Sequence, residues 1–213
     1  MRLAGQREQV ADHARRMVRD GLAVGLSGNI SVRAGEHVAI TPTGVDVDAL
    51  DAASVTVVDL DGQVADGELA PSSELAMHLA IYRTTSAGAV VHTHPPYATA
   101  LATVSDELPA VHYLVALLGG PVPVVDYATY GTRALAELVS DGLRDRSAVL
   151  LRNHGATTVG ATLEEAYHRA VQLEWLCRVH HHARQLGEPR TLPAEEISRV
   201  ADQLRTYGQP SER

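Results

Sequence analysis

The sequence contains no lysine, because all 18 residues in the Lys and Arg count are arginine. This absence excludes enzymes that form a Schiff base through lysine, pyridoxal-phosphate enzymes and phosphate-loop proteins, since each needs a side-chain amine. Phenylalanine is also absent, and one tryptophan and seven tyrosines supply all the aromatic surface. Scarce stacking surfaces and a net charge of −8 argue against nucleic acid as a partner.

Cysteine is almost absent as well. Cys177 stands alone, so the chain can form neither an internal disulfide nor a zinc site built from cysteines. The first residues become charged too early for the apolar core of a signal peptide. No apolar run approaches the roughly 20 residues that span a bilayer. We therefore expect a cytoplasmic protein with no membrane partner.

The 213 residues have the length of one domain, and we expect a single domain over residues 1–213. Apolar residues at helical spacing predict helices over 10–22, 72–84, 132–144 and 162–186, and a last helix ending near 207. Short β-branched or apolar runs predict strands over 30–32, 38–40, 55–58, 89–94, 122–126 and 148–151. This alternation predicts an α/β domain with helices on both faces of a central sheet.

Three histidines lie where two predicted strands end. His92 and His94 are two residues apart in a strand pattern, so their imidazoles are expected to point to the same face. His154 follows the predicted strand 148–151 and precedes a glycine. Three imidazoles with open positions are typical of catalytic zinc, and other divalent transition metals would also bind. The alternative is a pair of surface histidines on an edge strand; the third histidine at a second strand end favours a metal site.

The segment Pro71-Ser72-Ser73-Glu74 opens a predicted helix, where these residue types are expected as plain N-terminal capping. In the competing interpretation, the helix-terminal N–H groups and two hydroxyls bind an anion, with Glu74 beside them as an acid or base. Two further loops combine glycine with a hydrogen-bonding side chain, Gly28-Asn29 and Thr43-Gly44. Without lysine, a phosphate would need a cradle of this kind.

The remaining histidines and the cysteine show no converging pattern. His78 and His168 lie in predicted helices and are expected to be structural. Residues 180–182 are three successive histidines of the longest predicted helix, so they point in different directions and cannot converge on one ion. Cys177, in the same helix, is expected to be a small core residue.

Five segments, in this order along the chain, resemble the class II aldolase/adducin family, and within it most closely the L-fuculose-1-phosphate aldolases. They are SGNISVR at 27–33, TPTG at 41–44, PSSE at 71–74, VHTH at 91–94 and RNHG at 152–155. The resemblance implies a single three-layer α/β domain with a mostly antiparallel central sheet flanked by helices. It also implies a ring-shaped homotetramer with active sites at subunit interfaces.

The resemblance further implies a role for each matching residue. His92, His94 and His154 would bind Zn²⁺, one ion per subunit, and Glu74 would be the acid/base. Tyr113, in the segment PAVHY, would donate a proton to the aldehyde oxygen in a neighbouring subunit's site, and Tyr207 would close over the substrate. The residues implied to hold the substrate phosphate are Gly28, Asn29, Thr43, Gly44, Ser72 and Ser73.

The implied reaction is the reversible cleavage of L-fuculose 1-phosphate, or a similar deoxyketose 1-phosphate, to dihydroxyacetone phosphate and L-lactaldehyde. Without lysine no imine can accept the charge left by cleavage, so a metal ion must accept it as a Lewis acid. The alternatives within the family are methylthioribulose-1-phosphate dehydratases, pentulose-5-phosphate 4-epimerases and non-catalytic adducin-type binding modules. Epimerases typically carry Ser-Ser-Asp where this chain has Ser72-Ser73-Glu74, and a binding module needs no histidine set. A zinc hydrolase would leave the hydroxyl-rich loops unexplained.

Overall fold

The computed structural model describes residues 1–25 and 27–206. Within these residues one sheet contains nine strands, which are β1 (Asn29–Ala34), β2 (His37–Ile40), β3 (Thr56–Asp59), β4 (Val64–Asp66), β5 (Ala89–Thr93), β6 (Glu107–Leu108), β7 (Val122–Val125), β8 (Ala148–Leu151) and β9 (Gly155–Gly160). Their order in the sheet is β4-β3-β2-β1-β5-β9-β8-β7-β6. Every neighbouring pair is antiparallel except β7 and β8, which run parallel. The mostly antiparallel sheet implied by the resemblance is therefore confirmed.

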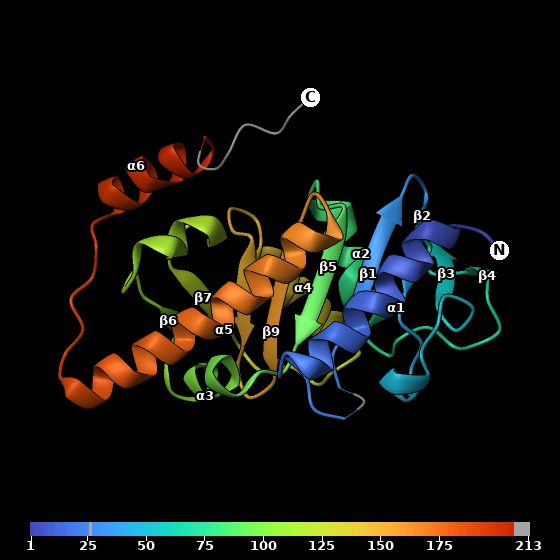
Figure 1. The fold of residues 1–213 in the computed structure, drawn as a ribbon, viewed down its shortest axis with the longest axis horizontal. Helices are drawn as coiled ribbons and strands as arrows, with labels where there is room; N and C mark the ends of the chain where they lie inside the picture. The colour runs from blue at the N-terminus through green and yellow to red at the C-terminus, as the bar shows by residue number, and fades with distance from the viewer. Residues whose placement is uncertain (26, 207–213) are drawn as a thin grey trace.

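Helices cover both faces of this sheet (Figure 1). They are α1 (Ala4–Arg19), α2 (Leu75–Thr84), α3 (Pro96–Val104), α4 (Arg133–Gly142), α5 (Leu163–Leu186) and α6 (Ala194–Leu204), with short 3₁₀ helices η1 (Val47–Ala49) and η2 (Tyr113–Leu118). Successive residues of β5 show the two layers, because Val91 packs in a cluster with α1 and α5, and Val90 packs in a cluster with α2 and α4. The three-layer α/β fold is confirmed.

Capping side chains explain where several helices begin. Thr162 and Glu165 have the sequence spacing of a capping box, and the hydroxyl of Thr162 accepts a hydrogen bond from the backbone N–H of Glu165. Helix α5 begins at the residue after Thr162. Thr132 caps α4 in the same way through the N–H of Leu135. Among the helices of the described residues, none has both the length and the apolar character needed to cross a bilayer.

Two elements beside the site differ from the sequence-based expectation. Strand β9 was not predicted, because its sequence, GATTVG, lacks the large apolar residues that mark a buried strand. Helix α3 was not predicted, because Pro95 and Pro96 directly follow the predicted strand 89–94 and prolines are typical breakers of a strand. Pro96 instead occupies the first turn of the new helix, where proline is tolerated. The carboxylate of Glu174 accepts hydrogen bonds from the backbone N–H groups of Tyr97 and Ala98 in the same turn.

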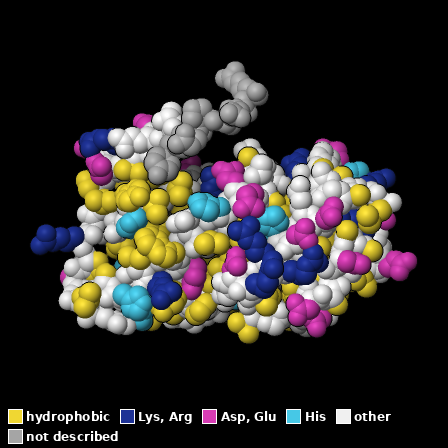
Figure 2. Space-filling model, in the orientation of Figure 1, with side chains coloured by type: hydrophobic (Ala, Val, Ile, Leu, Met, Phe, Trp, Pro, Cys, Tyr) yellow, Lys and Arg dark blue, Asp and Glu magenta, His cyan; other side chains and the backbone are white. Residues whose placement is uncertain are grey.

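The two ends of α5 carry different surfaces. Near its start, α5 contacts α1 and its C-terminal cap through polar side chains. Nη1 of Arg16 lies 3.2 Å from Oε1 of Glu164, and the Tyr167 hydroxyl donates a hydrogen bond to Oδ2 of Asp20 at 2.8 Å. Figure 2 shows charged side chains over this region and hydrophobic side chains gathered over η2, beside α6. The apolar character therefore concentrates at the end of the molecule that carries η2.

Candidate metal centre and active site

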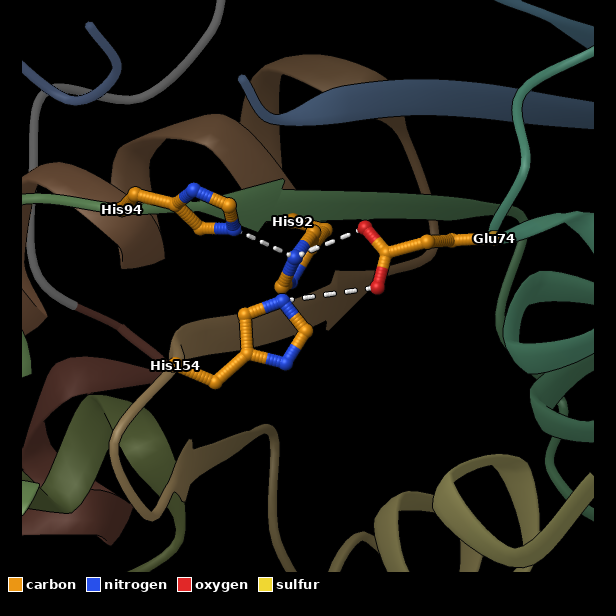
Figure 3. Close-up of side chains that lie close together, drawn as sticks. All are labelled: Glu74, His92, His94 and His154. Carbon is orange, nitrogen blue, oxygen red and sulfur yellow. Dashed lines mark hydrogen bonds and ion pairs between the residues drawn. The ribbon is translucent and has the colours of Figure 1, made fainter. Parts of the chain in front are cut away.

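Four predicted site residues meet where strands β5 and β8 end, near the middle of the sheet (Figure 3). His92 lies in β5, His94 directly follows that strand, His154 lies in the turn between β8 and β9, and Glu74 lies immediately before α2. Nε2 of His92 is 2.9 Å from Nε2 of His94 and 3.0 Å from Oε2 of Glu74. Nε2 of His154 is 3.5 Å from Oε1 of Glu74. The predicted convergence of the three imidazoles is confirmed, and the carboxylate joins them.

The β8–β9 hairpin brings His154 to this position. Asn153 has a φ of 53°, a left-handed conformation that asparagine tolerates, and it turns the chain sharply. Strand β9 then pairs with β5 in a register that places Ala156 opposite Thr93. Gly155 permits this approach, because a Cβ there would lie 2.3 Å from the carbonyl oxygen of Thr93. The close packing of β9 on β5 therefore sets the separation of His94 and His154.

The hydrogen bonds of His92 orient it as a metal ligand. Its Nδ1–H donates to the carbonyl oxygen of Ala156 at 3.0 Å and lies 3.1 Å from the Thr157 hydroxyl. The lone pair of Nε2 therefore points toward His94 and Glu74. Two ring nitrogens 2.9 Å apart need a proton or a cation between them, and Glu74 Oε1 is buried with no hydrogen-bond partner among the described residues. Three nitrogens and one oxygen fit a divalent metal ion.

Burial shifts the pKa values of the histidines and of the carboxylate in this cluster in opposite directions. It lowers the pKa of His94 to about 3 and that of His154 to about 4, so both rings stay neutral and able to bind a metal. Burial alone would raise the pKa of Glu74, but the neighbouring His92 ring and the Asn29 amide outweigh it and hold this pKa well below its usual range. The carboxylate is therefore ionised.

A cavity of about 340 Å³ opens beside the cluster. The predicted site residues that line it are Gly28, Asn29, Thr43, Gly44, Ser72, Ser73, Glu74, His94 and His154. Helix α2 begins at Leu75 rather than at the predicted residue 72, and the Ser72 hydroxyl accepts a hydrogen bond from the N–H of Glu74. Glu74 occupies the N-cap position of α2 without a capping hydrogen bond from its side chain, and its carboxylate turns to the histidines.

Tyr127 and Tyr130 also line this cavity, and the sequence interpretation missed them. They follow β7, which runs parallel to β8, so both strands end at the same edge of the sheet. Their position shortly after the predicted strand 122–126 is the feature of the sequence that could have indicated them as site residues. Tyr113 does not line the cavity; it begins η2 and is exposed beside the ring of His112. Tyr207 lies outside the described residues.

His78, which the sequence interpretation takes as structural, lies close behind Glu74. It is fully buried in α2, and its Nε2 lies 2.5 Å from Oδ1 of Asn29. Asn29 in turn donates from Nδ2 to Oε2 of Glu74 at 2.9 Å. One side chain, that of Asn29, therefore separates His78 from the carboxylate of Glu74.

Comparison with known proteins agrees with this geometry. The family model of the class II aldolase and adducin N-terminal domain matches residues 8–181. The chain belongs to the class II aldolase and adducin family. A family relative in Bacillus thuringiensis serovar kurstaki, a 5-deoxy-D-ribulose 1-phosphate aldolase, is 39% identical over 98% of this chain and 100% of its own.

Two further relatives are named as fuculose phosphate aldolases. An L-fuculose phosphate aldolase of Escherichia coli O6:H1 is 38% identical over 94% of both chains. A solved L-fuculose 1-phosphate aldolase superposes with a TM-score of 0.92 at 36% identity, over 94% of this chain and 96% of its own. The resemblance drawn from the five segments is therefore confirmed.

Proposed function

We propose that this protein is a zinc-dependent class II aldolase that reversibly cleaves a deoxyketose 1-phosphate to dihydroxyacetone phosphate and an aldehyde. The observation that carries the proposal is the convergence of Glu74 with three histidines at the wall of a hydroxyl-lined cavity. L-fuculose 1-phosphate, which would yield L-lactaldehyde, is the first candidate substrate. 5-Deoxyribulose 1-phosphate is the second, because the Bacillus relative named for it is 39% identical along its whole length.

The histidine set accounts for the metal part of the reaction. His92, His94 and His154 would hold Zn²⁺, which supplies a Lewis acid for the carbonyl and adjacent hydroxyl oxygens of the ketose phosphate. The Nδ1–H bond of His92 to β9 keeps its Nε2 free for this purpose. The chain offers no lysine for the alternative imine chemistry.

Glu74 would move the proton in this reaction. Its carboxylate is ionised and buried at the cavity wall, and Oε1 has no hydrogen-bond donor among the described residues. When the carbon–carbon bond breaks, the hydroxyl that becomes the aldehyde oxygen loses its proton, and the dihydroxyacetone phosphate half must gain one on carbon. Because its resting carboxylate is ionised, Glu74 would first have to take up a proton. Glu74 would carry that proton and would remove it again in the condensation direction.

The phosphate would be bound by the hydroxyl-bearing residues of the same cavity. The hydroxyls of Ser72 and Ser73 and the loop at Thr43-Gly44 would provide donors for it. A fixed phosphate orients the reacting carbon against Glu74, which lowers the entropic part of the barrier.

A homotetramer with shared sites would explain the position of Tyr113. Its side chain is 48% exposed and that of Trp175 is 41% exposed, and hydrophobic side chains gather over η2 (Figure 2). A neighbouring subunit that covers this surface could receive Tyr113 in its own cavity as the proton donor to the aldehyde oxygen. The same arrangement would bury apolar surface that one chain leaves exposed.

A retro-aldol assay tests the proposal. L-fuculose, 5-deoxyribulose, rhamnulose, ribulose and methylthioribulose 1-phosphates are each offered to the purified protein, and dihydroxyacetone phosphate is quantified with and without a strong chelator. Chelator-sensitive release from a deoxyketose phosphate is the expected result. If the zinc-loaded protein releases no dihydroxyacetone phosphate from any of them, the aldolase is refuted in favour of the dehydratase, the epimerase or the binding module.

A further inference from the structure

A second row of polar side chains lies behind Glu74, between α2 and β1. Glu74, His78 and Tyr82 are spaced four residues apart and so share one face of the helix. Asn29 and Ser31 are two residues apart on β1 and share one face of the strand. All five side chains are buried. One face of α2 therefore lies against one face of β1, and the side chains of both faces meet between them.

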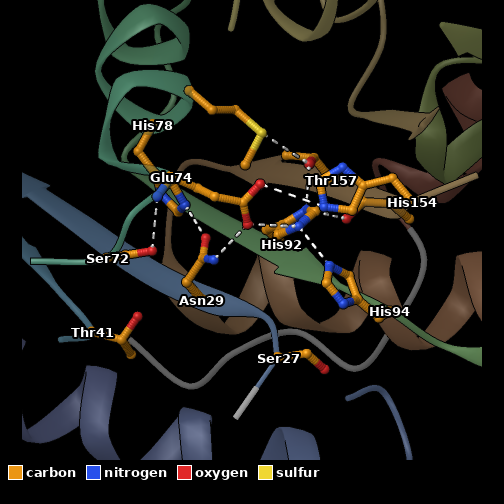
Figure 4. A network of polar contacts seen from close by, with 12 residues as sticks. Ser27, Asn29, Thr41, Ser72, Glu74, His78, His92, His94, His154 and Thr157 are labelled. Atoms are coloured by element: carbon orange, nitrogen blue, oxygen red, sulfur yellow. Dashed lines mark hydrogen bonds and ion pairs between the residues drawn. The ribbon is translucent and has the colours of Figure 1, made fainter. Parts of the chain in front are cut away.

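Hydrogen bonds join these side chains in one continuous line. Nδ2 of Asn29 lies 2.9 Å from Oε2 of Glu74, and Oδ1 of Asn29 lies 2.5 Å from Nε2 of His78 (Figure 4). Nδ1 of His78 lies 2.7 Å from the hydroxyl of Ser31. That hydroxyl lies 2.7 Å from the hydroxyl of Tyr82. The line runs from a carboxylate at the cavity wall into the interior.

The carboxylate determines the direction of each hydrogen bond. Ionised Glu74 can only accept, so Asn29 must turn its amide nitrogen toward it. The Asn29 carbonyl oxygen then faces His78 and needs an N–H there. Burial lowers the pKa of His78 to about 3, so the ring is neutral at neutral pH and carries a single proton, on Nε2. Nδ1 consequently accepts from Ser31, and Ser31 accepts from Tyr82.

The opposite tautomer would disturb Glu74. With the proton on Nδ1, Nε2 of His78 and Oδ1 of Asn29 would be two acceptors 2.5 Å apart. The Asn29 amide would then turn over and present its carbonyl oxygen to the carboxylate. Two negatively polarised oxygens at 2.9 Å would push Glu74 out of its place beside His92.

We propose that His78 is a positioning residue of the active site: its Nε2–H holds the Asn29 amide in the orientation that donates to Glu74 and so keeps the carboxylate aimed at the reacting carbon. His78 is fully buried and does not line the cavity, so it acts through Asn29. The inference rests on the proposed proton transfer by Glu74.

Two amide replacements separate this role from simple packing. In glutamine the amide lies one bond farther from the backbone than in asparagine. His78→Gln therefore places an N–H near the position of Nε2, where it can donate to Asn29. His78→Asn places its amide near the position of Nδ1, where it can accept from Ser31 but cannot reach Asn29. Each variant loses one buried hydrogen bond and the ring volume, so both are expected to unfold at a lower temperature than the wild type.

The two variants are expected to differ in turnover. For His78→Asn, kcat of the retro-aldol reaction falls by roughly ten- to a hundredfold, while KM and bound Zn²⁺ change little. His78→Gln keeps most of the wild-type kcat. His168→Asn, the same replacement at an exposed histidine of α5, is the control and is expected to behave as the wild type. Equal losses of kcat in the two His78 variants would show a packing role and overturn the proposal.

A second readout needs no turnover. ¹⁵N NMR of the wild-type protein, with the ring signals assigned by their loss in His78→Gln, reports which nitrogen carries the proton. A proton on Nε2 is expected, and a proton on Nδ1 overturns the proposal even if the protein is an active aldolase. A wild-type protein with the Nε2 proton but no aldolase activity would refute the proposed function and still support the placement of Asn29 by His78.

Discussion

Gly155 joins the third histidine of the metal cluster to β9, and its replacement by alanine tests how closely β9 must pack on β5. An added Cβ would lie 2.3 Å from the carbonyl oxygen of Thr93 and 2.7 Å from Cδ2 of His94. Side-chain carbons essentially never come within 3.0 Å of such atoms. The two strands must therefore separate locally by about 0.7 Å.

The clash has two measurable consequences. Overpacking costs about 1–3 kcal/mol of unfolding free energy, and in a domain of this size each kcal/mol lowers the melting temperature by about 2–4 °C. The displaced backbone carries His94, so the affinity for Zn²⁺ is expected to fall by roughly ten- to a hundredfold.

Thermal unfolding of chelator-treated protein measures the first effect, and competition with a fluorescent zinc chelator measures the second. Gly5→Ala is the matched control, because Gly5 lies in α1 and nothing lies within 4 Å of its added Cβ. Alanine is preferred over glycine in helices, so this variant is expected to keep or raise the stability and to bind Zn²⁺ normally. A Gly155→Ala protein with wild-type melting temperature and zinc affinity would refute the inferred link between strand packing and ligand placement.

Three further predictions follow from the site. Glu74→Gln is expected to lower kcat by roughly a hundred- to ten-thousandfold with Zn²⁺ still bound, and wild-type turnover in a metal-analysed sample would contradict its role in proton transfer. Tyr113→Phe is expected to be impaired alone but to regain activity when its chains are mixed with Glu74→Gln chains, and no gain on mixing would place the tyrosine in its own subunit's site. Burial lowers the pKa of His78 from 6.5 to about 3, so the unfolded chain takes up the proton first and stability is lost as the pH falls from 6.5 toward 3. From pH 7 to pH 5 the loss is about 2 kcal/mol, measurable by urea unfolding, and the same slope in His78→Gln would disprove this assignment.

Much of the fold could be predicted from the sequence, because most elements carry their signal locally. The capping pair at Thr162 and Glu165 marked the start of α5, and apolar runs such as 148–151 marked buried strands. β9 could not be found in this way, because its small residues give no local signal and its place in the sheet depends on pairing with β5 on one side and β8 on the other. Helix α3 was missed for a similar reason, since the carboxylate that caps it comes from α5.

The residues of the site also differ in whether the sequence alone could predict them. His92, His94 and His154 could be predicted because each stands at a strand end, where the local pattern indicates both the position and the chemistry. The role of His78 could not, because it appears only when α2 lies against β1 and Asn29 comes within hydrogen-bond distance. Tyr127 and Tyr130 line the cavity because β7 and β8 run parallel, which no short segment of sequence shows.

The wide spacing of the metal ligands along the chain has a consequence for folding. Glu74 and His154 are 80 residues apart in the sequence, and the pairing of β5 with β9 joins segments almost as distant. Such contacts form late, because closing long loops costs entropy before any contact repays it. A Zn²⁺ ion at this site would therefore meet its full ligand set only after α2, β5 and the β8–β9 hairpin have assembled. Its uptake during refolding should report the last step of folding, and added zinc should slow unfolding far more than it speeds folding.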